Sequence, residues 1–510
     1  MGGGNNFETE IKLIAFSEQV LEGIFELETV KKYMVAGSER KEKLESRYYD
    51  TPKRRFAKAG VVFRVRAEAD GFVGTVKIEN KNSGGLSERM EYNVKLPTAK
   101  PDFGGFGKIS FLADLPGMAA KDGGVEKLFS VGVERRRCEL ALPGRTAVEM
   151  AVDTGWITAG KKTTPVAEVE FELLSGKAPV LIDFLSWLLK EAPLYVERRS
   201  KYYRGCVLAG EKIKAAAGER PLKELDAKKP FKNALVNTLT AQIGRCLSAA
   251  TDAAAGGKKK LAAFYRETYE LKQLLFLAES LLKEHEYAPQ ANKIDLWLEE
   301  IRVAFLLEGF VKRWHLIQEN SSDIHVTDIF AKTLWEKKKQ AWEKLTKSFA
   351  RGVYTAEIFS LWAWIADDPW RDNAEITAAA YLSERRGLLL DKISVLAENG
   401  LNESAELYDY CYALAYSRKI PPAALSAGAA RAGKNLAKIL AALKSKAKLG
   451  QAGKALFSLF KPADSRLVYR DAGILYGSYL LEFTVDEARL AARLKDLMPK
   501  NKLPREEEAG

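Results

Sequence analysis

The stretch Glu8-Thr9-Glu10-Ile11-Lys12-Leu13 carries a charged side chain at every second position. Successive side chains of a β-strand point to opposite faces, so this spacing predicts a strand with one charged face. The spacing recurs along the first two hundred residues, for example where Arg64 and Arg66 alternate with Phe63 and Val65. Several strands therefore share a polar surface on which both signs of charge are dense.

The N-terminal part reads mainly as strands. We expect them at 7–14, 44–50, 60–68, 72–81, 86–96, 126–142, 146–153 and 165–174, the sixth interrupted near Gly132. Two amphipathic helices are predicted near 17–33 and 178–191. About eight antiparallel strands with a common polar face indicate either a half-solvated sheet or a closed barrel.

The pattern changes to helical spacing after residue 210. Helices are predicted at 231–254, 258–286, 290–317, 328–350, 353–366, 372–398, 402–417, 421–447 and 468–496. Their lengths and short connections are typical of an antiparallel bundle. We therefore predict an α+β chain with four parts: a strand-rich domain at 5–207, a linker at 208–229, an all-α domain at 230–498 and a flexible tail at 499–510.

Composition narrows the class of protein. The net charge of +12 and pI near 9.2 favour anionic partners, but the basic residues are too dispersed for a nucleic-acid stripe. Four scattered cysteines and three histidines argue against a disulfide framework and a zinc site. No leader peptide and no apolar run of membrane-spanning length is visible. We expect a soluble cytoplasmic protein that contacts no membrane and reads no nucleic-acid sequence.

Paired charges on single strands point to phosphate and metal binding. Arg64 and Arg66 present two planar guanidinium groups on one side of a strand, a geometry suited to bidentate phosphate contacts. Glu168 and Glu170 place two carboxylates on one face, where oxygen ligands hold Mg²⁺ or Mn²⁺. Carboxylates this close repel each other unless a cation lies between them.

These residues form an ordered set that resembles the CYTH domain of the triphosphate tunnel metalloenzyme superfamily, over about residues 5–206. The matching motifs are Glu8-x-Glu10-x-Lys12, Tyr48-Tyr49-Asp50-Thr51-Pro52, Phe63-Arg64-Val65-Arg66, Thr75-Val76-Lys77, Arg89-x-Glu91, the basic strand Arg135–Arg137, Ala167-Glu168-Val169-Glu170 and Ser200-Lys201. The resemblance implies an eight-stranded antiparallel barrel around a tunnel, with charged side chains inside and apolar faces outside under helices.

The resemblance also implies roles for individual side chains. Triphosphate would be bound by Lys12, Arg64, Arg66, Lys77, Arg89, Arg135, Arg137 and Lys201. Mg²⁺ or Mn²⁺ would be bound by carboxylates among Glu8, Glu10, Glu149, Asp153, Glu168 and Glu170. Glu8, Glu10, Lys12 and Lys77 are the predicted catalytic group, and Glu172 continues the acidic strand without a clear place in the motif.

The stretch Gly84–Val94 looks like bacterial inorganic triphosphatases in which a CYTH barrel precedes a helical CHAD domain. The histidine followed by an arginine ladder that CHAD domains carry is missing around His285, His315 and His325. A basic group does fall on one helical region, at Arg431, Lys434, Lys438, Lys444, Lys446 and Lys448. It forms either a solvated helix face or a surface for long-chain polyphosphate.

The leading functional hypothesis is an inorganic triphosphatase that splits tripolyphosphate into pyrophosphate and phosphate with a divalent metal ion. A class IV adenylyl cyclase and a thiamine or nucleoside triphosphatase are the enzymatic alternatives. A non-catalytic polyphosphate-binding protein is the alternative from another class. The acidic positions favour an enzyme, since binding an anion does not need them.

Overall fold

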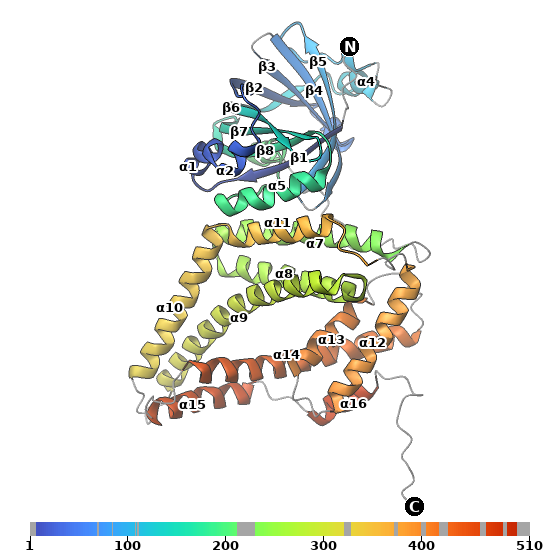
Figure 1. Cartoon of the computed structure of the whole chain (residues 1–510). Helices are drawn as coiled ribbons and strands as arrows, with labels where there is room; N and C mark the ends of the chain where they lie inside the picture. The colour runs from blue at the N-terminus through green and yellow to red at the C-terminus, as the bar shows by residue number, and fades with distance from the viewer. Residues whose placement is uncertain are drawn as a thin grey trace, which may run out of the picture. The chain divides into compact units, whose positions relative to one another are not determined.

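The computed structural model describes residues 7–68, 71–83, 85–107, 109, 112–211, 230–320, 328–371, 376–398, 404–417, 427–459, 466–482 and 487–496 (Figure 1). The chain divides into two compact units. The first comprises residues 1–220, 240–260 and 348–368, and the second comprises 221–239, 261–347 and 369–510.

Eight antiparallel strands form a closed barrel in the first unit. They are β1 (Phe7–Ile14), β2 (Arg40–Asp50), β3 (Val61–Glu68), β4 (Gly71–Ser83), β5 (Leu86–Leu96), β6 (Glu126–Leu142), β7 (Thr146–Ala159) and β8 (Lys162–Ser175). They pair in the order β5-β4-β3-β2-β6-β7-β8-β1, and β1 pairs again with β5. The short strand β9 (Tyr195–Val196) adds to β1. The predicted barrel is confirmed, and the open half-solvated sheet is excluded.

The apolar faces of the strands point away from the barrel axis and are covered by short helices. Phe63 and Val65 of β3 are buried in one cluster with Phe106 of η2 (Gly104–Phe106) and Leu115 of α4 (Leu115–Ala120). On another side lies the amphipathic helix α5 (Ala178–Glu191), whose Leu181, Phe184 and Leu188 are buried. Burying the outer faces leaves the charged side chains of the same strands to face the barrel interior.

Two details of the predicted strand domain are wrong. β6 runs without interruption through Gly132, which pairs with Glu45 on one side and Trp156 on the other. Gly155 of β7 makes this close approach possible, since a Cβ there would lie 2.1 Å from the Gly132 carbonyl oxygen. The helix predicted at 17–33 is three pieces, namely α1 (Glu18–Glu22), η1 (Gly23–Glu26) and α2 (Glu28–Tyr33), because the backbone at Leu27 is extended.

The C-terminal part is largely helical, as predicted. Its helices are α7 (Phe231–Ala254), α8 (Lys258–Ala278), α9 (Glu284–Asn320), α10 (Asp328–Ala350), α11 (Val353–Ala366), α12 (Ala378–Glu398), α13 (Ser404–Ser417), α14 (Ala427–Ser458), α15 (Arg466–Glu482) and α16 (Glu487–Lys495). The helix predicted to continue to 286 ends at Ala278, because Leu282 is extended and bridges to Trp370. One core of the second unit joins Phe310 of α9, Phe330 of α10, Leu456 of α14 and Leu475 of α15.

None of the helices among the described residues combines the length and apolar character that crossing a membrane requires.

The compact units do not follow the predicted domain ranges. Residues 240–260 and 348–368, from the predicted helical domain, belong to the unit that contains the barrel. Within this unit α11 packs against α5 (Figure 1). The helix α6 (Lys201–Ala209) occupies the start of the predicted linker, whose residues 212–229 lie outside the described part, as does the predicted tail. The boundaries at 207 and 230 stay a prediction.

A fragment that ends at Gly210 should be less stable around α5 than the full chain. It lacks α11, so apolar surface of α5 that α11 covers would face water, and exposed apolar area costs stability. We expect faster amide hydrogen exchange along α5 in the fragment, with exchange in β3 and β4 as the internal comparison. Equal protection of α5 in the fragment and in the full chain would contradict this expectation.

Candidate active site in the tunnel

The charged faces of the strands enclose a cavity of ≈ 480 Å³. Its lining contains seven basic and seven acidic side chains, namely Lys12, Arg64, Arg66, Lys77, Arg89, Arg135 and Lys201 with Glu8, Glu10, Glu91, Glu149, Asp153, Glu170 and Glu172. The protein groups therefore balance each other's charge. A bound polyanion would upset this balance unless cations entered with it.

Strand register brings the acidic side chains into rows. Asp153 of β7 lies opposite Glu168 of β8, and Glu170 lies opposite Lys12 of β1. One rung further along β8, Glu172 lies between Glu10 of β1 and Glu149 of β7. The pairings of β1 with β8 join parts of the chain that are more than 100 residues apart, so the sequence alone could not predict them.

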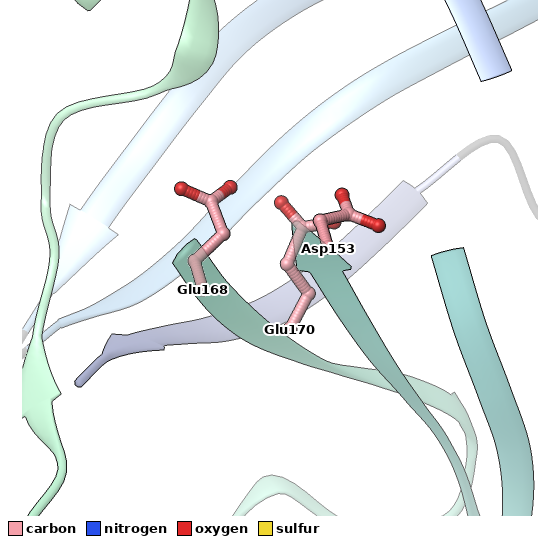
Figure 2. A group of neighbouring side chains, drawn as sticks. All are labelled: Asp153, Glu168 and Glu170. Carbon is pink, nitrogen blue, oxygen red and sulfur yellow. The ribbon is translucent and has the colours of Figure 1, made fainter. Parts of the chain in front are cut away.

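Asp153, Glu168 and Glu170 form a candidate metal site (Figure 2). Each offers one carboxylate oxygen, and the three oxygens lie within 4.8 Å of one another. Glu168 and Asp153 are fully buried. Oε1 of Glu168 accepts no hydrogen bond within the described residues, although the Lys201 ammonium lies beside it. Three hard oxygen ligands this close together fit a divalent cation such as Mg²⁺ or Mn²⁺.

Two buried lysines neutralise these carboxylates. Lys201 Nζ lies 2.7 Å from Asp153 Oδ2 and 3.0 Å from Glu170 Oε1, and it also contacts Glu168. Lys12 Nζ lies 3.2 Å from Glu170 Oε1 and 3.8 Å from Glu168 Oε1. Burial alone would raise the pKa of Glu170, but Lys201, Lys12 and Arg135 hold that pKa well below its usual value. The Glu170 carboxylate is thus kept ionised and available as a ligand.

Arg64 and Arg66 form the most basic part of the lining. Their side chains project from β3 and are only 14% and 21% exposed. Burial, with the neighbouring Arg64 charge, lowers the pKa of Arg66 despite its hydrogen bond to Glu68. Two guanidinium groups that repel each other in a buried place favour an anion between or beside them.

The other end of β1 carries a second ion-pair group. Lys77 Nζ donates to Glu8 at 2.8 Å and lies 2.5 Å from Glu91, while Arg89 donates to Glu10. Burial, which outweighs the attraction of Lys77, raises the pKa of Glu8. Burial would raise the pKa of Glu10 too, but Arg89 and Lys12 hold it below its usual value. The pKa values of Glu8 and Glu10, which are neighbours on one face of β1, are thus shifted in opposite directions.

Arg135 and Arg137 of β6 have different surroundings. Arg135 makes two 2.7 Å hydrogen bonds to Asp153 and one of 2.9 Å to Glu170. Arg137 is not part of the cavity lining, and its side chain is 36% exposed while it bonds Glu42 and Glu149. Glu168 is fully buried, is not among the lining residues and contacts Lys201. The other predicted site residues line the cavity.

Arg204, Tyr48 and Tyr202 are among the residues near the tunnel that were not part of the predicted site. Arg204 donates to Glu168 from the same helix as Lys201, three positions later, a spacing that the sequence would have revealed once the helix was known. Tyr48 and Tyr202 line the cavity, and both rings pack on Phe129. No charge alternation marks these tyrosines.

The fold is a closed antiparallel barrel, and the site is a tunnel with balanced charges and a carboxylate cluster. Residues 6–205 match the CYTH domain, which confirms the predicted resemblance for this part of the chain. The chain is also similar to the inorganic triphosphatase of Haemophilus influenzae (strain ATCC 51907 / DSM 11121 / KW20 / Rd), at 30% identity over 171 residues. That match covers 33% of this chain and 47% of the Haemophilus protein, so it spans about half the length of the relative.

Solved structures show two further similarities. The Hippeastrum protein HpAC1, described as having a dominant triphosphatase activity, is 20% identical, with a TM-score of 0.30 over 40% of this chain and 97% of that one. The CHAD domain of the plant Ricinus communis, the kind of domain predicted for the helical part, is 17% identical. Its TM-score is 0.38, over 55% of this chain and 98% of that domain.

Glu172 should make the metal-free protein less stable as the pH rises. Burial, followed by the charges of Glu8 and Glu10, raises its pKa to about 7 from 4.5. A raised folded-state pKa adds stability that is complete below the unfolded pKa and is lost as the pH rises through the folded value. We expect Glu172→Gln to gain stability relative to wild type between pH 4.5 and pH 8, measured by urea unfolding in EDTA.

Glu91→Gln is the matched control with the opposite sign. Lys77 and Arg64 hold the pKa of Glu91 below its usual value against the effect of burial. Its carboxylate therefore stabilises the fold above the unfolded pKa, and Glu91→Gln should lose stability at neutral pH. Parallel pH profiles for wild type and Glu172→Gln would contradict the assignment of Glu172.

Proposed function

We propose that this protein hydrolyses tripolyphosphate to pyrophosphate and phosphate with the help of Mg²⁺ or Mn²⁺. The observation that carries the proposal is the pairing, in one enclosed cavity, of buried guanidinium and ammonium groups with the carboxylates of Asp153, Glu168 and Glu170. Phosphoryl transfer depends on positioning the phosphates and neutralising their charge, and the cavity offers both.

The basic side chains would hold the substrate. Arg64 and Arg66 would bind terminal phosphate oxygens in bidentate contacts. Lys12, Lys77, Arg89, Arg135 and Lys201 would bind along the chain, exchanging part of their present contacts with carboxylates for contacts with phosphate. Such fixed charges in a water-poor tunnel offset the negative charge that grows on the leaving pyrophosphate. Arg137, at the edge of the cavity, would act on the substrate only indirectly, through Glu149.

Carboxylates on both sides of the tunnel would handle the metal and the water. Asp153, Glu168 and Glu170 would hold a divalent ion, with Glu149 and the Glu8 and Glu10 pair as further ligands. When bound, such an ion neutralises phosphate oxygens and lowers the pKa of water. Glu8, whose pKa is raised, is suited to accept a proton from the attacking water, and Lys77 fixes its orientation.

The rival enzymatic functions require a place for a base or a thiamine ring. The two tyrosines that line the cavity stack on Phe129 in a core cluster with Val131 and Val133. Both rings are thus already engaged by protein side chains, and the rest of the lining is rich in charged groups. This favours an inorganic chain over adenylyl cyclase, thiamine triphosphatase or nucleoside triphosphatase activity.

Long-chain polyphosphate is the second ligand that we propose, for the helical part of the chain. Burial and the charges of Lys444 and Arg313 lower the pKa of Lys448 in α14. Three cations that repel each other favour a polyanion. The side chains of Arg431 and Lys434 lie outside the described part. A cytoplasmic location is proposed from the sequence alone.

Phosphate release with tripolyphosphate, thiamine triphosphate, ATP and long polyphosphate tests the proposal. We expect release from tripolyphosphate with Mg²⁺ or Mn²⁺, loss of activity in EDTA and recovery when metal is restored, because the carboxylate cluster needs a cation beside the substrate. Cyclic AMP formation would favour the cyclase. Polyphosphate binding without any phosphate release would favour the non-catalytic protein, and full turnover in EDTA would remove the metal from the proposal.

Arg64→Ala should lower kcat/KM for tripolyphosphate by roughly a hundredfold or more, since a lost electrostatic contact of this kind costs about 3 kcal/mol in the transition state. Arg64→Lys should restore only part of the activity, because an ammonium cannot replace the planar guanidinium. Steady-state kinetics of the three proteins provide the measurement.

Val65→Ala and Arg47→Ala are the controls. Val65 is buried on the outer face of the same strand, so its truncation should lower the melting temperature, by the equivalent of about 2 kcal/mol, and spare the rate per folded molecule. Arg47, opposite Val65 on β2, is 43% exposed outside the tunnel. Arg47→Ala should therefore change neither the melting temperature nor the rate per folded molecule. An Arg64→Ala enzyme as active as Arg47→Ala would refute the assignment of Arg64.

A further inference from the structure

One peptide group links a helix of the C-terminal part to a tunnel lysine. Val196 and Glu197 share the peptide bond at the end of β9. The carbonyl oxygen of Val196 accepts a 3.0 Å hydrogen bond from the hydroxyl of Thr251 in α7. The amide of Glu197, on the other side of the same peptide group, donates a 3.0 Å hydrogen bond to the carbonyl oxygen of Lys12. Thr251, β9 and Lys12 all lie in the first compact unit.

The other residue of β9 is anchored to a second helical segment of the same unit. The hydroxyl of Tyr195 donates to the carbonyl oxygens of Phe349 at 2.7 Å and Ala350 at 2.9 Å, at the end of α10. The Tyr195 side chain is buried, and burial raises its pKa to about 12, so the hydroxyl stays a donor. Gly352 follows directly with φ +69°, and a Cβ there would lie 3.1 Å from the Cα of Pro193. The corner between α10 and α11 thus closes tightly on the chain that enters β9.

β9 stands next to both lysines of the carboxylate cluster. Lys12 is its neighbour across the sheet. Lys201 follows four residues after Glu197, at the start of α6, which Ser200 caps by accepting the amide of Tyr203 at 3.1 Å. Both ammonium groups meet at Oε1 of Glu170, at 3.2 Å and 3.0 Å. A shift of β9 would move Lys201, which follows along the chain, relative to Glu170, and would remove the bond that β9 adds to the Lys12 backbone beside its pairing with β8.

β9 has few other bonds to keep it in place. It contains two residues, and its ladder with β1 comprises the pairs Leu13–Val196 and Ile14–Tyr195. A hydrogen bond to the carbonyl of a peptide group also polarises the amide of that group and strengthens the bond that the amide donates. The hydrogen bond from the Thr251 hydroxyl to the Val196 carbonyl therefore also strengthens the hydrogen bond from the Glu197 amide to the Lys12 carbonyl.

We propose that Thr251 and Tyr195 are positioning residues of the tunnel, which hold β9 so that Lys12 and Lys201 stay aligned on the carboxylate cluster. The proposal rests on the proposed function, because it states what the alignment serves. It assigns to the 240–260 and 348–368 segments a part in hydrolysis, although neither segment supplies a residue to the cavity lining.

Substitutions in the full chain test the proposal. Thr251→Val keeps the shape of the side chain and removes the hydroxyl, and Thr251→Ser restores it. Losing one hydrogen bond should lower kcat/KM for tripolyphosphate and speed amide exchange at Glu197, each by roughly fivefold. Both values should return close to wild type in Thr251→Ser. Tyr195→Phe, which keeps the ring, should act in the same direction.

Thr238→Val is the matched control on the same helix. The hydroxyl of Thr238 donates to the carbonyl of Ala234 one turn earlier, as that of Thr251 does to Leu247, but within the described residues it makes no hydrogen bond to β9. A merely structural role of Thr251 would give both valine variants the same profile, with a small change in melting temperature and an unchanged kcat/KM. Measurements well below the melting temperature separate rate from stability.

Two readouts distinguish the failure of this proposal from the failure of the proposed function. A wild-type protein that releases no phosphate from tripolyphosphate overturns the proposed function. An active wild type whose Thr251→Val variant keeps full kcat/KM, or keeps slow exchange at Glu197, overturns the positioning role. The positioning role is supported if Thr251→Val and Tyr195→Phe both lower kcat/KM and lose slow amide exchange at Glu197. Thr251→Ser should recover both values, and Thr238→Val should keep both.

Discussion

Closure of the barrel puts a dense set of charges where water is scarce, and the rest of the site follows from that constraint. An isolated ion inside a protein costs several kcal/mol, so each buried charge needs a partner. The strand register supplies these partners, as where Lys12 of β1 lies opposite Glu170 of β8. The apolar outer faces, buried against short helices, provide the favourable free energy that keeps the charged faces turned inward.

On the proposed function, the same balance would suit a triphosphate that enters the tunnel together with metal ions. Basic and acidic groups of the lining neutralise each other. A polyanion can pair with the basic side chains only if the carboxylates that lose these partners bind other cations. Lys201 occupies the place among Asp153, Glu168 and Glu170 that a divalent ion would share. The proposed substrate and metal would therefore bind best together, which would explain why an acidic cluster lies among the basic groups of the lining.

The helical segments at 240–260 and 348–368 extend this network beyond the strands. Thr251 of one segment is hydrogen-bonded to the two-residue strand β9, whose Tyr195 bonds the other segment, and the Glu197 amide after β9 bonds the backbone of Lys12. A site that depends on ion pairs within a few tenths of an ångström gains from such support, since small displacements weaken electrostatic contacts steeply in a medium of low dielectric constant.

The sequence by itself determined the strands, their charged faces and most of the charged lining residues, because a period of two is a local property that any strand obeys. It could not decide whether the charged face looked inward or outward. That depends on the pairing of β1 with β5, a contact between residues about 80 positions apart. It also could not place Arg137 at the edge of the cavity, bring Arg204 to Glu168 or assign α11 to the barrel. These features arise from register and packing between distant segments, which only the tertiary structure fixes.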